Sequence, residues 1–181
     1  MRLFVALRPP PPVRDALTAL MGGIEGARWQ SDNNLHLTLA FIGEVDRHQA
    51  EAATDALATL VAPPLDLSLG QFGSFEAERA DRTAALWIGV TPAEPVATLA
   101  AAIRAALRRA GLEPDARKFV PHITLARFSR AGASRDALRP WLSTITAPQA
   151  SWRADGFHLV QSHLGHDGPH YEPVASYTLS G

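Results

Sequence analysis

Two similar stretches, "LHLTLAFIG" at residues 35–43 and "PHITLARFS" at residues 121–129, decide how this chain is expected to fold. Each is an apolar run typical of a buried β-strand, and each contains a histidine and a threonine two positions apart. Successive side chains on a strand point to opposite faces, so the histidine and the threonine share one face and the aliphatic residues share the other. The sequence therefore predicts two strands that each have one face in the core and one polar face.

The two histidines, His36 and His122, lie close to half of the 181-residue chain apart, and each half has the order strand, helix, strand, helix. This repetition indicates an internal duplication with one copy of the motif per lobe. Strands are predicted over residues 2–7, 36–42, 64–72, 83–90, 122–128, 157–164 and 171–179. Helices are predicted over 13–21, from the cap Asp46 through Leu60, from Thr91 or Glu94 through Leu107 with Gly111 as C-terminal cap, and over 134–142. The charged segment 76–82 is predicted to be an exposed loop.

The composition is that of a globular protein, with 46% hydrophobic and 19% charged residues. A chain of 181 residues is expected to form one substantial domain, or two small lobes that share a core. The formal net charge of −1 supplies no global attraction for long nucleic acid, so any contact with RNA must be local. The sequence has no cysteine, which excludes disulfides and thiolate zinc sites.

The apolar segments are short. The opening "MRLFVALRPP" has an apolar run too short for a signal peptide, and no apolar stretch reaches the ~20 residues that span a bilayer. We therefore expect a cytoplasmic protein that does not interact with membranes, and the sequence indicates no obligate protein partner.

The paired motif suits the cleavage of a phosphodiester. If the two strands lie near each other, His36, Thr38, His122 and Thr124 converge on one polar cleft. Cleavage needs a base and an acid, and imidazole, with an ordinary pKa of ~6.5, serves as either near neutral pH. The threonine hydroxyls can donate hydrogen bonds to the non-bridging phosphoryl oxygens, where charge builds in the transition state. This scheme requires no metal or other cofactor, whereas the alternative is that each histidine only makes a structural hydrogen bond in the core.

Four blocks of sequence carry a family resemblance: "MRLFVALRPPPPVRDAL" at residues 1–17, "ARWQSDNNLHLTLAFIGEV" at 27–45, "RKFVPHITLARF" at 117–128 and "FHLVQSHLGHDGPHYEPVASYTL" at 157–179. Together they resemble the RNA 2',3'-cyclic phosphodiesterases, also called 2'-5' RNA ligases, of the two-histidine (2H) phosphoesterase superfamily. The resemblance implies an α+β fold in which residues 1–181 form a single bilobal, pseudo-symmetric domain. Its two antiparallel sheets would face each other across a central cleft, with helices on the outside.

The resemblance also implies an activity, the metal-independent hydrolysis of RNA 2',3'-cyclic phosphate ends to 2'-phosphate ends. It implies that His36 is the proton donor to the leaving 3' oxygen and that His122 is the base that activates water. Exchange of these roles in the reverse direction implies that the site can join RNA ends through a 2'-5' linkage. The expected partners are therefore RNAs with 2',3'-cyclic phosphate or 2'-5' linked termini.

One arginine in the second motif is a further candidate for binding phosphate. Arg127 stands where the family's second motif often carries arginine, and a guanidinium can hold a phosphate through two parallel hydrogen bonds. By strand alternation Arg127 faces away from His122 unless the strand bends. The alternative is therefore an arginine that points from the strand end to solvent.

Other candidates for contact with RNA flank the two motifs. Phe41 and Phe119 are candidates for stacking on a base, which is worth ~1–3 kcal/mol, and core packing is the alternative for Phe41. Lys118 and Arg130 are candidates for contact with flanking phosphates, and a solvated surface position is the alternative for each.

The C-terminal tail is rich in histidine. The spacing of His163, His166 and His170 is similar to that of metal ligands on a helix. However, the glycines and the proline between them break a helix, and "GHDGPH" at residues 165–170 is predicted to be the turn of a hairpin. We therefore predict that the chain binds no metal there.

Two alternatives to hydrolysis of cyclic phosphate ends of RNA stay open. The first is a diesterase for a small cyclic or 2'-5' linked nucleotide, since one phosphate and one or two nucleotides would fill the cleft. The second is a non-catalytic protein that binds RNA ends in the same cleft.

Overall fold

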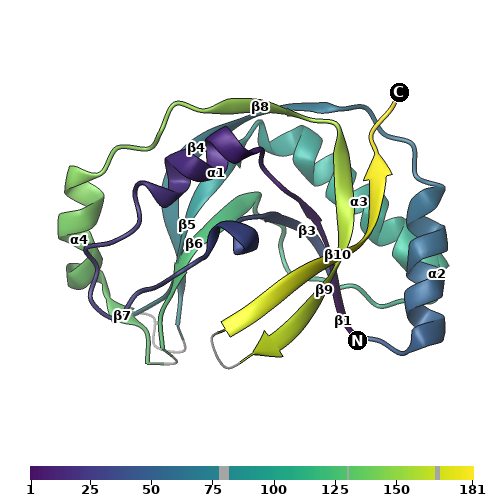
Figure 1. The fold of residues 1–181 in the computed structure, drawn as a ribbon, viewed down its shortest axis with the longest axis horizontal. Coiled ribbons are helices and arrows are strands. Elements are labelled where there is room, and N and C mark those ends of the chain that lie inside the picture. The colour runs from purple at the N-terminus through teal and green to yellow at the C-terminus, as the bar shows by residue number, and fades with distance from the viewer. Residues whose placement is uncertain (78–81, 130, 166–167) are drawn as a thin grey trace.

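The computed structural model describes residues 1–77, 82–129, 131–165 and 168–181, and within these the chain forms a curled antiparallel sheet with four α-helices (Figure 1). The strands are β1 (Arg2–Leu7), β2 (Arg28–Trp29), β3 (Leu37–Glu44), β4 (Leu65–Glu76), β5 (Arg82–Thr91), β6 (His122–Arg127), β7 (Ala133–Ser134), β8 (Ser151–Ala154), β9 (Gly156–Gly165) and β10 (Gly168–Thr178). The helices are α1 (Pro11–Thr18), the 3-10 helix η1 (Asp32–Asn34), α2 (Arg47–Ala58), α3 (Ala93–Arg109) and α4 (Arg135–Thr144). The predicted α+β class is confirmed.

The sheet has two halves that meet between β3 and β6. Its strand order is β10-β9-β1-β3-β6-β5-β4-β8, with antiparallel pairing between neighbours. β3 and β6 share one residue pair, Leu37 with Ile123. Each of these residues directly follows the histidine of its motif, so the junction brings the two copies of the motif together. The two antiparallel halves are thus joined by this pair into one curled sheet.

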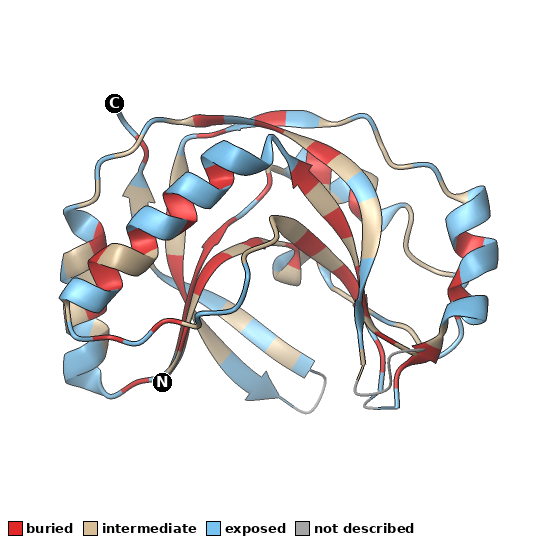
Figure 2. Cartoon of the chain, turned by 180° about the vertical axis from the view of Figure 1, so that it is seen from behind, coloured by how far each residue is buried: buried red, intermediate tan, exposed pale blue. Residues whose placement is uncertain are grey.

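The aliphatic residues of both motifs lie in the main core. Leu37, Leu39, Ile123 and Leu125 are fully buried and belong to one continuous apolar cluster. Helix α3 packs on β3, and α2 packs beside α3. Figure 2 shows the buried residues running along the strands, while the outer faces of the helices are exposed. One face of each motif strand is therefore used for stability, which leaves the other for polar side chains.

Capping interactions set the ends of two helices as predicted. The Oδ1 atom of Asp46 accepts a hydrogen bond from the Gln49 backbone N–H at 2.8 Å, and the Gln49 Oε1 atom accepts one from the Asp46 N–H at 3.0 Å. Gly111 follows α3 with a φ of 81°, in the left-handed region that favours glycine after a helix. In the described part of the chain, no helix is long and apolar enough to cross a membrane.

Several features differ from the predicted elements, among them β10, which begins at Gly168 within the predicted turn 165–170. Thr91 is still part of β5, where it pairs with β4, so α3 begins at Ala93 rather than at Thr91 or Glu94. Strand β4 extends to Glu76 and β5 begins at Arg82, which shortens the expected loop, and positions 78–81 lie outside the described residues. The sequence does not predict β8, a strand of four residues that pairs with β4 at the edge of the sheet.

Candidate active site

His36 lies between an anchoring carbonyl and two aromatic rings. Its Nδ1 atom is 2.7 Å from the carbonyl oxygen of Asn34. A carbonyl only accepts hydrogen bonds, so Nδ1 carries the proton and Nε2 is the nitrogen left to exchange one. The imidazole ring centroid is 4.9 Å from that of Phe4 and 5.1 Å from that of Tyr171, which meets it edge-on. The Asn34 side chain is itself held by a 2.9 Å hydrogen bond to the carbonyl of Pro169 on β10.

His122 repeats this arrangement in the second half. Its Nδ1 atom is 2.6 Å from the carbonyl oxygen of Val120, which is again two residues earlier in the chain. Its ring centroid is 4.8 Å from that of Phe75 and 5.6 Å from that of Trp87, on β4 and β5. Both histidines thus have the same tautomer, with Nε2 available, and both are oriented by a pair of aromatic side chains.

Burial makes both imidazoles weak bases in the free protein. It lowers the pKa of His36 to about 4, an effect that the Asn34 hydrogen bond opposes and that the positive charges of Arg127 and His122 reinforce. Burial also lowers the pKa of His122, where the Val120 hydrogen bond opposes it and Arg127 again reinforces it. Both histidines are therefore neutral near pH 7 before any ligand binds.

The threonines of the motif lie on the same faces as the histidines. Thr38 pairs with Ala6 of β1, and Thr124 pairs with Trp87 of β5. Both side chains are half-buried, between fully buried aliphatic neighbours. Among the residues that the structure describes, neither hydroxyl has a hydrogen-bond partner. Both hydroxyls can therefore donate to a ligand.

A bulge in β6 brings Arg127 to the histidine face. Leu125 and Ala126 are consecutive and both fully buried, and the pairing with β5 shifts register between Leu86 and Trp87. The extra residue reverses the alternation, so Arg127 shares the face of His122. In addition to burial, the positive charge of Arg127 lowers the pKa of His36 and His122, and it opposes the rise that burial causes in the pKa of Tyr171, as expected of a guanidinium that lies near all three. The bulge thus supplies the bend in the strand without which Arg127 would face away from His122. On this face, Arg127 can contact a phosphate bound between the histidines.

The same bulge occurs in β3. Leu39 and Ala40 are both buried, and the pairing with β1 shifts register between Val5 and Ala6. Phe41 is consequently on the face of Thr38, at the position in the first motif that Arg127 occupies in the second. The guanidinium carbon of Arg2 lies 5.0 Å from the centre of the Phe41 ring. An arginine therefore stands beside this position too, although it comes from β1.

Among the described residues, Phe119 and Lys118 make no hydrogen bond or ring contact with either histidine. Phe119 packs against the main core, and the guanidinium carbon of Arg104 is 5.3 Å from its ring centre. Lys118 is exposed in the segment before β6. Arg130 lies outside the described residues. Contact of these three with RNA stays a prediction.

The histidines of the tail form a pair on the β9–β10 hairpin. His163 and His170 are directly opposite each other, with ring centroids 6.4 Å apart, and the Nε2 atom of His163 is 3.1 Å from Glu172 Oε2. His166 lies outside the described residues. Across the described residues, no group of three or more histidine, aspartate or glutamate side chains is placed to hold a metal ion.

Sequence reasoning missed the aromatic residues that surround the two imidazoles. Phe4, Tyr171, Phe75 and Trp87 come from four strands that are distant from the motifs in sequence. The sequence predicts the strands that contain Phe4, Trp87 and Tyr171, whereas Phe75 lies beyond residue 72, the predicted end of its strand. What the sequence lacks is a signal for which strands lie beside the histidines.

Comparison with known proteins agrees with this geometry. The family model described as the 2'-5' RNA ligase superfamily matches residues 9–166. An RNA 2',3'-cyclic phosphodiesterase of Thermus thermophilus is 34% identical, over 100% of this chain and 91% of its own length, and one of Thermotoga maritima is 30% identical, over 100% and 97%. The crystal structure of E. coli LigT complexed with 3'-AMP superposes with a TM-score of 0.80 at 27% identity, over 99% of this chain and 98% of that one.

Proposed function

The chain belongs to the 2'-5' RNA ligase superfamily, and we propose that it hydrolyses the 2',3'-cyclic phosphate ends of RNA to 2'-phosphate ends without a metal ion. The observation that carries this proposal is the matched pair of histidines. Each holds its Nδ1 proton against the carbonyl two residues earlier and keeps Nε2 available. The relatives named RNA 2',3'-cyclic phosphodiesterase support the same reaction. One histidine-threonine pair comes from each half of a single bilobal domain.

In the proposed reaction, water attacks the phosphorus atom and the bond to the 3' oxygen breaks. The Nε2 atom of His122 takes the proton from water, and the Nε2 atom of His36 gives its proton to the 3' oxygen. Thr38, Thr124 and Arg127 donate hydrogen bonds to the non-bridging oxygens as negative charge builds on them. A 5'-hydroxyl in place of water would instead produce a 2'-5' linkage, which is the proposed route to ligation.

The anionic substrate supplies the proton state that this mechanism needs. In the free protein the pKa of His36 is about 4, so its imidazole is neutral near pH 7 and cannot act as a proton donor. A cyclic phosphate carries one negative charge, and an opposite charge beside a histidine raises its pKa. Binding of the phosphate therefore raises the pKa of His36, so that its Nε2 atom becomes protonated.

We expect kcat/KM for cyclic phosphate opening to be highest below pH ~6.5, the ordinary pKa of histidine. Its pH dependence reports the free enzyme, in which the productive form has one protonated and one neutral imidazole. Since the pKa values of both His36 and His122 are lowered, both are neutral above this pH and the donor is missing. Initial rates over a pH series with a non-titrating cyclic phosphate substrate test this, and a maximum clearly above pH ~6.5 would contradict it.

The proposed function is tested by following an oligoribonucleotide that ends in a 2',3'-cyclic phosphate, with EDTA present. Phosphorus NMR should show conversion to the 2'-phosphate, because His36 protonates the 3' oxygen. The same enzyme with added Mg²⁺ or Mn²⁺ serves as the control and should show an unchanged rate. Formation of the 3'-phosphate, or loss of turnover in EDTA with recovery on adding metal, would refute the proposal.

A further inference from the structure

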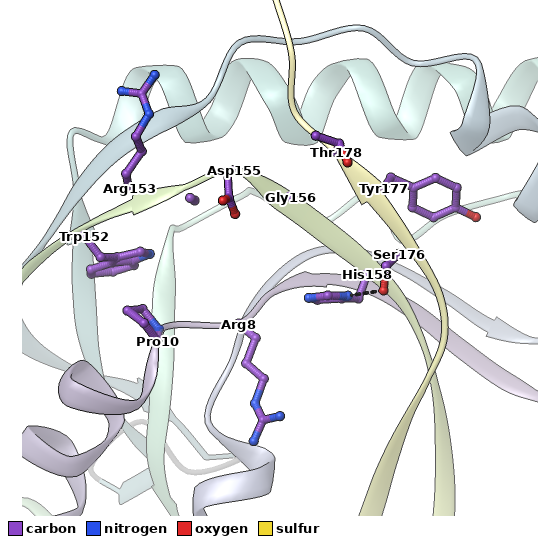
Figure 3. A pocket seen from close by; sticks show the side chains of 11 residues that line it. Arg8, Pro10, Trp152, Arg153, Asp155, Gly156, His158, Ser176, Tyr177 and Thr178 are labelled. Atoms are coloured by element: carbon purple, nitrogen blue, oxygen red, sulfur yellow. Dashed lines mark hydrogen bonds between the residues drawn. The ribbon is translucent and has the colours of Figure 1, made fainter.

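A pocket of about 350 Å³ lies at the end of the sheet face that carries His36 (Figure 3). Its polar lining includes Arg8 after β1, Asp155 between β8 and β9, His158 on β9 and Ser176 on β10, and Trp152 of β8 forms a wall. The volume is within the usual range for small-ligand sites. None of these residues belongs to the two histidine-threonine pairs.

The register of the sheet places this pocket beside the motif. Ser176 pairs with His158, His158 pairs with Ala6, and Ala6 pairs with Thr38. Residues that are directly opposite in a sheet share a face, so His158 and Ser176 are on the face of Thr38. Two strand spacings, about 10 Å, separate the backbones of His158 and Thr38, and only the methyl group of Ala6 stands between them. A single nucleoside can span this distance.

One end of the pocket is suited to bind an anion. The Nδ1 atom of His158 is 2.8 Å from the Ser176 hydroxyl, and within the described part of the chain the other imidazole nitrogen has no hydrogen-bond partner. Burial lowers the pKa of His158 and the positive charge of Arg8 lowers it further, while in Figure 3 the Arg8 side chain, which also lines the pocket, points its guanidinium away from the imidazole. Among the described residues, Arg8 contacts Asp32 Oδ2 at 3.4 Å and Asn33 Oδ1 at 3.2 Å, and both are exposed contacts of the kind that contribute little to stability. Its guanidinium can therefore turn to a phosphate at little cost.

The other end of the pocket has the opposite character. In Figure 3 the Asp155 carboxylate lies above the level of the His158 imidazole, and the Arg8 guanidinium lies below it. Arg153, also at the rim, points away and bonds both carboxylate oxygens of Asp66, at 3.1 and 3.0 Å. Trp152 is 8% exposed, and its indole N–H has no partner in the described part of the chain. A carboxylate repels phosphate and accepts hydrogen bonds from sugar hydroxyls, so the pocket suits a nucleotide better than a simple polyanion.

We propose that this pocket binds the nucleotide that precedes the cyclic-phosphate end in an RNA strand, with Arg8, His158 and Ser176 on the phosphodiester that joins the two. The ribose of that nucleotide lies toward Asp155 and Trp152. This inference rests on the proposed function and narrows its substrate class to RNA of two or more nucleotides. A diesterase for single cyclic nucleotides would have no use for such a subsite.

The test compares adenosine 2',3'-cyclic phosphate with the dinucleotide that carries one more adenosine at its 5' side. For the wild type, kcat/KM should be about tenfold or more higher for the dinucleotide, as expected for charge-assisted hydrogen bonds to its phosphodiester. Arg8→Gln and Ser176→Asp should each remove most of this preference. Arg153→Gln is the matched control, since its guanidinium is engaged with Asp66, and it should keep the preference within about twofold.

Equal kcat/KM values for the two wild-type substrates, or a preference that survives both Arg8→Gln and Ser176→Asp, would overturn the subsite. Failure of the proposed function is a different result, the absence of turnover with either substrate. In that case, calorimetry is used to compare the affinity of the protein for the corresponding 2'-phosphate mononucleotide with its affinity for the dinucleotide. Tighter binding of the dinucleotide by the wild type but not by Arg8→Gln supports the subsite, and equal binding refutes it.

Discussion

Replacement of His122 or His36 by alanine is expected to lower kcat for cyclic phosphate opening by about 10²–10⁴-fold, the range for loss of a general acid or base. Each imidazole has Nε2 available on the same polar face, and within the described residues no other histidine has an equivalent position beside Thr38 or Thr124. The measurement is the initial rate with an oligoribonucleotide cyclic phosphate in the presence of EDTA. Thermal unfolding of each variant establishes that it is folded.

The matched control for these variants is His48→Ala. His48 is exposed on α2, away from the face of the sheet that carries the motifs, and its loss should leave kcat unchanged. Undiminished turnover in either His36→Ala or His122→Ala would show that this histidine takes no part in the reaction. A similar loss in His48→Ala would indicate a general effect of the substitution.

Arg127→Gln is expected to lower kcat by about 10²–10³-fold, as found when one donor to a developing negative charge is removed. The bulge at Leu125 and Ala126 brings this guanidinium to the face of both histidines. The variant should also raise the pKa of His36 and of His122, because a nearby positive charge that disfavours their protonated forms is gone. Both values can be followed by NMR titration of the imidazole resonances.

Arg127→Lys separates the two roles of this side chain. Lysine keeps the charge, so the histidine pKa values should stay low, but it cannot make two parallel hydrogen bonds and should leave much of the kcat defect. Arg139→Gln, an exposed substitution on α4, is the control and should change neither quantity. If Arg127→Gln leaves kcat and both pKa values unchanged, the guanidinium lies outside the reaction centre.

Short-range residue patterns were enough to predict most helices and strands, because the start and end of each depend mainly on residues close together in the sequence. The compact apolar run in 2–7 and the cap at Asp46 specify a strand and a helix without reference to the rest of the chain. The joining of the two halves could not be predicted in this way. It depends on a single pair, Leu37 with Ile123, between residues that are far apart in sequence.

The orientation of Arg127 marks the limit of reasoning from strict alternation. Regular alternation turns Arg127 away from His122, and only the β6 bulge turns it back. A signal is present in the sequence, since Leu39-Ala40 and Leu125-Ala126 are two adjacent apolar residues at the same place in each copy. One of each pair would be on the polar face of a regular strand. Two such pairs in duplicated strands favour a bulge in both.

The pocket at Arg8, His158 and Ser176 could not be derived from the sequence for a different reason. These residues come from the ends of three strands and form one site only through the register of β9 with β1 and β10. His158 is also one of several histidines in the tail, where the sequence suggests a question about metal rather than about nucleotide binding.

The central claim, that His36 and His122 act as donor and acceptor, is tested most directly with a cyclic phosphate whose 3' bridging oxygen is replaced by sulfur. A thiol has a pKa of ~8.5, far below that of an alcohol, so sulfur leaves without protonation. We predict that His36→Ala opens this substrate at a rate within about tenfold of wild type, while His122→Ala stays slower by about 10²-fold or more. If the sulfur substrate restores the rate of His122→Ala instead, or of neither variant, the assignment of His36 as donor and His122 as acceptor is contradicted.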